Sequence, residues 1–578
     1  MRGARIDYGG VAVGAKESFM PSTTEAAEFS DLSQLQRDGL TFKNIVNPCE
    51  LYSTVLDGSA IPLPSDTTNV NIGWWSEQIS GEDGTFAQPI EITFVADEVF
   101  TSSGITLSFD AQNNTFANYL NIKWYNGDTL LSSMDFYPDT FFYFCQNKVE
   151  YYNKVVINFY KLNMPYNRLK VRAIEYGMKI TFYGNELRNV SLMQEVDAIS
   201  SKIPINTGNI VIDSHRNIDY TFQKRQPLTV YFDENLHATL FVKTANRQSK
   251  TLWSVQAEDY VGILDNIPFA GGIYKDKNAI DLINEISEVS KIPFDISNDF
   301  ADEVVTGYIP YTTCRNALSQ IAFVIGAIVD TSYSAMVRVY KISNEISQEI
   351  PLKRIMQGQT FKDETEITAI DVTAYKYTPI DEDMTAYDAL ELGEGEGILV
   401  KFNEPLHDLK ITNGEIIESG ANYAIINIQA GGVLEGKKYL RTTKTKRKQN
   451  PNVLRTNTDR IISVSQAYLV SENILDNMLD ICYNYYKQNN SVASLKIVDG
   501  KREKELAPVA YGTRKYGEFV YGTGAKLGEI EYDTPTRIGD VIVCATEYLG
   551  DIQGLIVKQS YTLNGGILVK NTELRRYD

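Results

Sequence analysis

The chain has 578 residues, of which 43% are hydrophobic and 22% are charged, and it is rich in tyrosine and phenylalanine. This composition excludes a disordered protein, and the length predicts about three to five domains. The formal net charge of −19 argues against nucleic-acid binding over the general surface, because phosphates would be repelled.

No stretch approaches the roughly 20 apolar residues that a membrane-spanning helix needs, and the first residues lack the apolar run of a signal peptide. We therefore expect no membrane segment and assembly in the cytoplasm. The five cysteines are scattered and form no CxxC pair: Cys49, Cys145, Cys314, Cys482 and Cys544. They predict reduced, buried thiols without disulfides or zinc, and we expect no metal and no other cofactor.

Residues 1–45 are predicted to form an N-terminal arm, with a short helical stretch near 23–39. A terminal segment without its own core needs a neighbour to order it. Residues 46–177 alternate apolar and polar positions, with many aromatic side chains and turn formers about every ten residues. This pattern predicts a jelly-roll-like β-sandwich, because half-buried strands have a period of two.

Four aromatic residues of the sandwich leave two interpretations open. Trp74, Trp75, Trp124 and Tyr125 either belong to the core or line a sugar-binding face, since aromatic rings stack on the apolar faces of sugars. Residues 178–265 contain further short strands, which predict a compact barrel or half-barrel.

Residues 266–345 predict a small α/β domain made of helix, strand, helix and hairpin. The first helix is expected at 277–290. The second begins after Thr312 or Thr313, whose hydroxyl can cap it, and ends at Gly326. The apolar residues of this second helix recur with helical spacing: Leu318, Ile321, Ala322 and Ile325.

From 346 to 465 the strand pattern returns, followed by a long helix at about 466–488 and closing strands up to 578. Residues 437–455 contain eight lysines or arginines and no acid. This window is either a solvated loop or a docking surface for an acidic partner. Its most concentrated basic side chains are Lys444, Lys446, Arg447 and Lys448.

Cys314 stands near the first turn of the second helix, where amide dipoles lower the pKa of a thiol. A cysteine nucleophile also needs an imidazole base, and none of His215, His237 and His407 lies in a recognisable motif. The glycine-rich stretches at 393–399 and 522–528 lack the spacing of a phosphate-binding loop. We therefore expect Cys314 to be a packing residue and the chain not to be an enzyme.

Several segments together resemble the tail-hub proteins of Gram-positive phages and of phage-tail-like contractile bacteriocins. They are "IKWYNGDTLL" (122–131), the stretch from "YFCQ" to "IEYG" (143–177), "GYIPYTTCRNALSQIAFVIGAIVD" (307–330) and "ILVKFNEP" (398–405). The resemblance covers roughly 46–578. Its most specific positions are Gly307, Ile309, Pro310, Arg315, Ala317, Leu318, Gln320, Ile321 and Ala322.

The resemblance implies a mainly β, multidomain structural protein with two tube-like barrels per chain, at 178–265 and 346–465, the second followed by the closing elements of 466–578. Such a hub is a homotrimer that joins the six-fold tail tube to the three-fold spike or tip. The implied partners are the tube protein, the spike or tip protein, surrounding baseplate or distal tail proteins and the tape-measure protein. The implied location is the tail tip or baseplate of a virion or tail-like particle.

The same resemblance implies that any wall-cleaving activity resides in another protein, since the chain stops soon after its last strands. The sandwich at 46–177 is an addition to the minimal hub and is similar to a carbohydrate-binding jelly roll. An alternative function is therefore that of a carbohydrate-binding module that recognises glycan of the host cell wall.

Overall fold

The computed structural model is mainly β and contains several domains. It describes residues 4–12, 14–25, 32–36, 45–46, 61–62, 73–111, 113–214, 222, 224–232, 235–343, 345–355, 358–363, 366–451, 453, 460–488, 491–497, 536–546, 549–564 and 567–576. No helix in this part of the chain combines the length and the apolar character needed to cross a bilayer.

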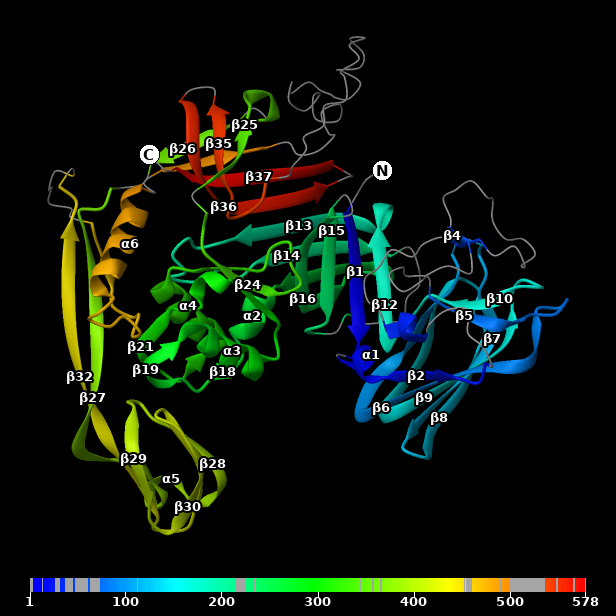
Figure 1. Cartoon of the computed structure of the whole chain (residues 1–578), viewed down its shortest axis with the longest axis horizontal. Coiled ribbons are helices and arrows are strands. Elements are labelled where there is room, and N and C mark those ends of the chain that lie inside the picture. Colours follow the sequence, from blue (N-terminus) through cyan, green and yellow to red (C-terminus); the bar gives the residue numbers. More distant parts are fainter. Residues whose placement is uncertain are drawn as a thin grey trace. The chain divides into compact units, whose positions relative to one another are not determined.

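The chain divides into two compact units, whose elements are labelled in Figure 1. The first unit comprises Met1–Arg5, Tyr183–Arg225 and Thr229–Asp578, and the second comprises Ile6–Phe182 and Gln226–Leu228. Each unit has its own apolar core.

The second unit contains the predicted β-sandwich. Its larger sheet has the strand order β11-β6-β9-β7-β8, with β2 added to β6, and a two-stranded sheet joins β5 to β10. The two sheets bury their apolar side chains in one shared core. The strands are β2 Met20–Thr23, β5 Trp74–Ile79, β6 Thr85–Ser108, β7 Ala117–Asn126, β8 Thr129–Phe136, β9 Phe142–Leu162, β10 Arg168–Val171 and β11 Ala173–Glu175.

The N-terminal arm is ordered by this sandwich. The ring of Phe19 stacks on the ring of Tyr176, with centroids 4.4 Å apart, and the side chains of Ala15 and Leu35 join the same core. The predicted helical stretch near 23–39 contains a 3-10 helix, η1 (Leu32–Gln36). Thr23 instead ends strand β2, and residues 26–31 and 37–39 lie outside the described residues. The arm also supplies β1 (Ala4–Val11), which pairs with β12 (Gly177–Tyr183), and α1 (Ala15–Ser18).

The first unit is built around a large, open sheet with strand order β15-β16-β17-β14-β13-β36-β37-β34-β26; β35 adds to β36, and β25 to β35. Its strands are β13 Leu187–Glu195, β14 Thr207–Asp213, β15 Pro227–Phe232, β16 Asn235–Arg247, β17 Leu252–Glu258, β25 Ile346–Ile350, β26 Thr360–Asp363, β34 Ser491–Leu495, β35 Val541–Thr546, β36 Gly550–Asn564 and β37 Ile567–Arg576. The strands predicted as a barrel at 178–265 therefore share their sheet with strands from the other end of the sequence.

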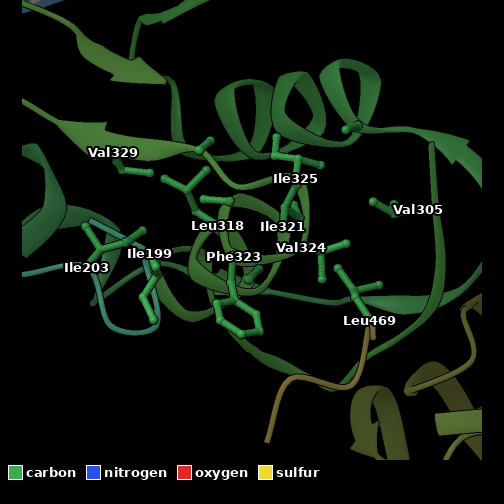
Figure 2. Close-up of a cluster of buried hydrophobic side chains, with 14 of the residues drawn as sticks. Ile199, Ile203, Val305, Leu318, Ile321, Phe323, Val324, Ile325, Val329 and Leu469 are labelled. Atoms are coloured by element: carbon green, nitrogen blue, oxygen red, sulfur yellow. The ribbon is translucent and has the colours of Figure 1, made fainter. Parts of the chain in front are cut away.

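An α/β core follows in the first unit, as predicted. It contains α2 Tyr260–Leu264, β18 Pro268–Phe269, β19 Gly272–Asn278, α3 Ala279–Ser290, β20 Phe294–Ile296, β21 Val304–Ile309, β22 Thr312–Thr313, α4 Cys314–Ile325, β23 Ile328–Asp330 and β24 Val337–Tyr340. Helix α4 begins and ends at the predicted residues, because Thr313 caps the backbone N–H of Asn316 and Gly326 adopts a left-handed conformation. Figure 2 shows Leu318, Ile321 and Ile325 of α4 in the buried cluster of this core.

A second sheet of the first unit has the order β29-β32-β27-β33, with β27 Ala369–Asp388, β29 Leu406–Ile411, β32 Val433–Gln449 and β33 Ile461–Val464. Helix α6 (Leu475–Gln488) packs against β27 and β32. It begins later than the predicted residue 466 because the preceding backbone bonds to other strands. The carbonyls of Tyr468 and Val470 accept hydrogen bonds from the N–H groups of Tyr308 and Tyr375.

A small β module extends from the β27–β32 hairpin. It consists of α5 Ala389–Leu392, β28 Gly395–Lys401, β30 Gly414–Ser419 and β31 Tyr423–Ile428, and it has a separate apolar core. The buried carboxamide of Asn422 ties this module to the α/β core, donating to the carbonyls of Ala270 (2.7 Å) and Ile309 (2.8 Å).

Candidate interaction surfaces

The stretch 307–330, which carries the most specific part of the resemblance, forms a packing unit of the α/β core. The side chain of Arg315 joins neighbouring segments, donating from Nε to the Ile203 carbonyl (2.9 Å) and from Nη1 to Asp265 Oδ2 (3.2 Å). Gly307 has a φ of 150°, and a Cβ there would lie 2.6 Å from the Tyr468 carbonyl oxygen. Only glycine therefore allows this close approach of two backbone segments.

The thiol of Cys314 belongs to this packing unit. The residue is buried, its Sγ lies 3.9 Å from the Pro268 carbonyl oxygen, and burial raises its pKa to about 11. A protonated thiol at neutral pH is a poor nucleophile. The arrangement therefore favours packing over reaction.

His237 and His407 lie within the described ranges, and each contacts aromatic or charged groups. His237 packs edge-on against the rings of Phe232 and Tyr561, and His407 Nδ1 lies 3.1 Å from Asp408 Oδ2. His215 lies outside the described residues. Within the described ranges, no three His, Cys, Asp or Glu side chains are grouped as metal ligands.

The three tryptophans singled out as core or sugar-binding residues lie inside the second unit. The side chains of Trp74, Trp75 and Trp124 are 0% exposed, so no indole face is open to a sugar. Tyr125 is half-buried, and the ammonium of Lys154 lies 5.3 Å from its ring centroid. This burial supports the core interpretation.

Trp75 lies in a buried charge cluster. The ammonium of Lys170 is 4.3 Å from its ring centroid, and Asp110 pairs with both Lys170 (3.3 Å) and Arg172 (3.1 Å). Burial alone would raise the pKa of Asp110, but the two cations outweigh it and hold that pKa below its ordinary value. The cluster is a paired structural feature of the sandwich.

Residues 437–449 of the basic window lie in strand β32 and not in a loop, and they include Lys444, Lys446, Arg447 and Lys448. Alternate side chains on one face meet acids on or just before α6. Lys444 pairs with Glu472 (3.9 Å), Lys446 with Asp476 (2.6 Å) and Lys448 with Asp480. Acids of the chain itself thus pair with these three lysines.

The side chain of Arg447 points to the next strand. Its guanidinium makes two 2.7 Å hydrogen bonds to the carboxylate of Asp371 on β27. This hydrogen bonding, together with the charge of Arg447, lowers the pKa of Asp371.

Two adjoining cavities lie in the first unit. The larger, of about 630 Å³, is lined by five cations and three carboxylates: Lys202, Lys362, Arg460, Lys558 and Arg575, and Glu195, Asp197 and Glu573. The second, of about 560 Å³, adjoins α4 and shares Ser201 and Tyr486 with the first. The lining of the second cavity is mostly hydroxyl, amide and apolar side chains.

No protein-family model and no curated protein matches the chain. Among solved structures, a tail protein from Neisseria meningitidis is 11% identical, with a TM-score of 0.41, over 68% of this chain and 93% of its own. A prophage tail protein from Shewanella oneidensis is 8% identical, with a TM-score of 0.40, over 68% and 94%. A prophage tail protein from Listeria monocytogenes is 10% identical, with a TM-score of 0.34, over 68% and 91%.

Proposed function

We propose that the chain is a structural subunit of a phage tail or a phage-tail-like particle. In this role it forms a homotrimeric hub that joins the six-fold tail tube to the three-fold spike or tip and anchors baseplate proteins. Its partners would be further copies of itself, the tube, spike and distal tail proteins, and the tape-measure protein.

The observation that supports this proposal best is the presence of two separate sheets, one large and one four-stranded, connected to one α/β core. Ile199 and Ile203 follow β13 of the first sheet, and Ile370 and Val372 belong to β27 of the second; all four are buried in the α/β core. Three copies of a chain with two such sheets supply six sheet positions around an axis, which matches a six-fold tube.

The sheet edges suit assembly into a ring. Among the described strands, β26 pairs only with β34, and β25 pairs only with β35. Unpaired edges are a liability in a monomer, whereas neighbouring subunits in a ring pair or cover them. We propose that the β25 and β26 edges are such subunit contacts, and we assign no enzymatic step to the chain.

Light scattering and negative-stain imaging of the purified chain test this proposal. We expect light scattering to give the mass of a trimer and imaging to show closed three-fold particles. After tube protein is added, these particles should join the tail tube. Ile346→Lys, at an exposed position of β25, should lower the trimer fraction, whereas Val289→Lys, at an equally exposed position of α3, should not. A stable monomer that joins no tube or baseplate protein would overturn the proposal.

A further inference from the structure

The larger cavity of the first unit, called here the cationic cavity, carries more positive charge than its own carboxylates balance. Of its five cations, Lys558 pairs with Glu195 at 3.7 Å. Among the described residues, the side chains of Lys202, Lys362 and Arg575 have no carboxylate partner. The cavity therefore retains cations that can meet the negative charge of a ligand.

The remaining carboxylates of the cationic cavity do not cancel this charge. Asp197 is engaged by its own loop, since its Oδ2 accepts from the hydroxyl of Ser201 (2.7 Å) and from the N–H of Lys202 (3.1 Å). Glu573, on β37, lies opposite Lys558 of β36. Five cations against three carboxylates leave a local charge of +2, in a chain whose formal net charge is −19.

The cationic cavity also offers apolar surface beside its cations. Tyr485 and Tyr486 of α6 line it together with Val492 and Val557, and the guanidinium of Arg575 lies 5.5 Å from the ring centroid of Tyr485. Its volume of about 630 Å³ is within the range of ligand pockets. The lining suits a ligand with carboxylates next to apolar groups, because a compact anion would leave the apolar side chains uncovered.

Such a ligand is present in the chain itself, on the small β module. The turn from α5 into β28, residues 390–396, is called here the acidic turn, and both elements are labelled in Figure 1. Its apolar side chains are open to solvent, since Leu390 is 78% exposed and Leu392 65%. Exposed apolar groups with charged neighbours are typical of a binding surface.

The carboxylates of the acidic turn are also available. They are exposed, and none of them pairs with a cation in the part of the chain that the structure describes. They belong to Glu391, Glu394 and Glu396. The acidic turn thus matches the cationic cavity in charge and in apolar character.

We propose that the acidic turn of one copy docks into the cationic cavity of a second copy of this chain. Its carboxylates pair with Lys202 and Lys362, and its leucines cover Tyr485 and Tyr486. Lys362 belongs to β26, whose edge is proposed above as a subunit contact, so the cavity continues that surface. Because the turn and the cavity are different surfaces, the contact is head-to-tail and can close a ring. The inference rests on the proposed homotrimer and identifies one of its contacts.

Charge reversal in the full chain tests this contact, with sedimentation velocity over a dilution series. Glu394→Lys/Glu396→Lys and Lys202→Glu/Lys362→Glu should each raise the protein concentration at which half of the trimer dissociates by about tenfold or more, because like charges then face each other. A chain with all four substitutions should recover most of the parent's association, since its charges are exchanged. Failure of this recovery would overturn the inference.

The matched control is Glu404→Lys/Glu415→Lys. It changes two exposed glutamates near the acidic turn in sequence but outside it, one after β28 and one on β30, and alters the net charge as the turn variant does. Its association should equal that of the parent, and circular dichroism should show the same fold for all variants. Equal weakening by the control and by the turn variant would overturn the inference.

Cross-linking with a carbodiimide, which joins a carboxylate directly to a lysine, maps the contact in the assembled parent. Labelled (¹⁵N) and unlabelled chains are mixed while dissociated and then allowed to assemble. We expect cross-links from Glu394 or Glu396 to Lys202 or Lys362 that join a labelled peptide to an unlabelled one. Cross-links confined to single copies would overturn the inference.

Failure of this inference is distinguishable from failure of the proposed function. A parent trimer whose association is unchanged by Glu394→Lys/Glu396→Lys would overturn the docking of the acidic turn and leave the homotrimeric hub standing. A parent chain that stays monomeric at every concentration would overturn both.

Discussion

Asp259 is a buried acid at the start of α2, inside the α/β core. Its Oδ1 accepts from the N–H of Gly262 (3.2 Å) and its Oδ2 from the hydroxyl of Thr331 (2.6 Å). Burial raises the pKa of Asp259 to about 7, and the nearby Asp330 adds to the rise, although these hydrogen bonds oppose it. The folded protein therefore holds this proton more tightly than the unfolded chain does.

From this pKa we predict the pH dependence of an Asp259→Asn variant. The contribution of Asp259 to stability is fully present below about pH 4 and declines as pH rises to about 7. The variant should therefore be most destabilised relative to the parent near pH 4 and least above pH 7. Urea unfolding of the variant and the parent between about pH 4 and pH 8 measures this difference in unfolding free energy.

Asp371→Asn is the control of opposite sign. Because Arg447 lowers the pKa of Asp371, that acid contributes stability above its unfolded-state pKa, which is lost as pH falls. Asp371→Asn should thus be least destabilising at low pH. If the loss of unfolding free energy depended on pH in the same way for the two variants, the raised pKa of Asp259 and the lowered pKa of Asp371 would both be contradicted.

At single positions the sequence predicts local geometry well and partners poorly. Thr313 and Gly326 bound α4 as expected, because caps depend on adjacent residues. The need for Gly307 depends on Tyr468, which is 161 positions away in sequence, so no local pattern reveals it. The burial of Trp124 could likewise not be predicted, since strand alternation does not say which face of a sheet is covered.

At the scale of elements, the ion pairs between β32 and α6 form because the spacing of side chains along the strand matches the spacing along the helix. Alternate strand residues lie about 7 Å apart and helix residues four apart lie about 6 Å apart, so lysines at every second position match acids at every fourth. Lys446 and Asp476 form the central pair of the three ion pairs between β32 and α6, called here the ion-pair ladder. The sequence predicted the basic side chains but not the facing acids, because helix α6 is placed by packing of its apolar stripe.

We predict that Asp476→Lys lowers the stability of the first unit by about 0.5–1 kcal/mol, since exposed pairs contribute this much. The double variant Lys446→Glu/Asp476→Lys should recover most of the loss. The effect should shrink in 1 M salt, where charges are screened within about 3 Å. Asn477→Lys introduces the same cationic side chain at an exposed neighbouring position of α6, without removing an acid, and serves as the control. Equal losses for Asp476→Lys and Asn477→Lys would show that the ladder contributes nothing.

At the scale of the whole molecule, the two units have separate apolar cores. Tryptophans report on them unequally: Trp74, Trp75 and Trp124 belong to the second unit and Trp253 to the first. Unfolding of the second unit should therefore dominate the tryptophan fluorescence change.

We predict two unfolding transitions in calorimetry. Ile321→Ala should lower the unfolding free energy of the first unit by about 2–5 kcal/mol, because it leaves a cavity in that unit's core. Ile157→Ala should lower the unfolding free energy of the second unit by a similar amount, for the same reason. The fluorescence midpoint should follow Ile157→Ala. A single transition shifted alike by both variants would contradict two independent units.

Fold class could be predicted from the sequence because alternation and turn formers are local signals. The pairing of the large sheet could not. Strand β13 pairs with β36, so Val190 lies opposite Leu563, and the intervening residues give no hint of that partner. The strands at 178–265, predicted as a compact barrel or half-barrel, thus belong to a sheet that strands from the other end of the sequence complete.

This late pairing has a consequence for synthesis on the ribosome. Nearly all of the second unit has been translated by residue 182, and its last contribution by residue 228, so it can mature early. More than 350 residues separate β13 from β36 in the sequence, so the large sheet cannot be completed until those residues have been translated. Until then, the edge of β13 that pairs with β36 stays unpaired. A prematurely terminated chain lacks that partner strand, so it cannot complete the large sheet.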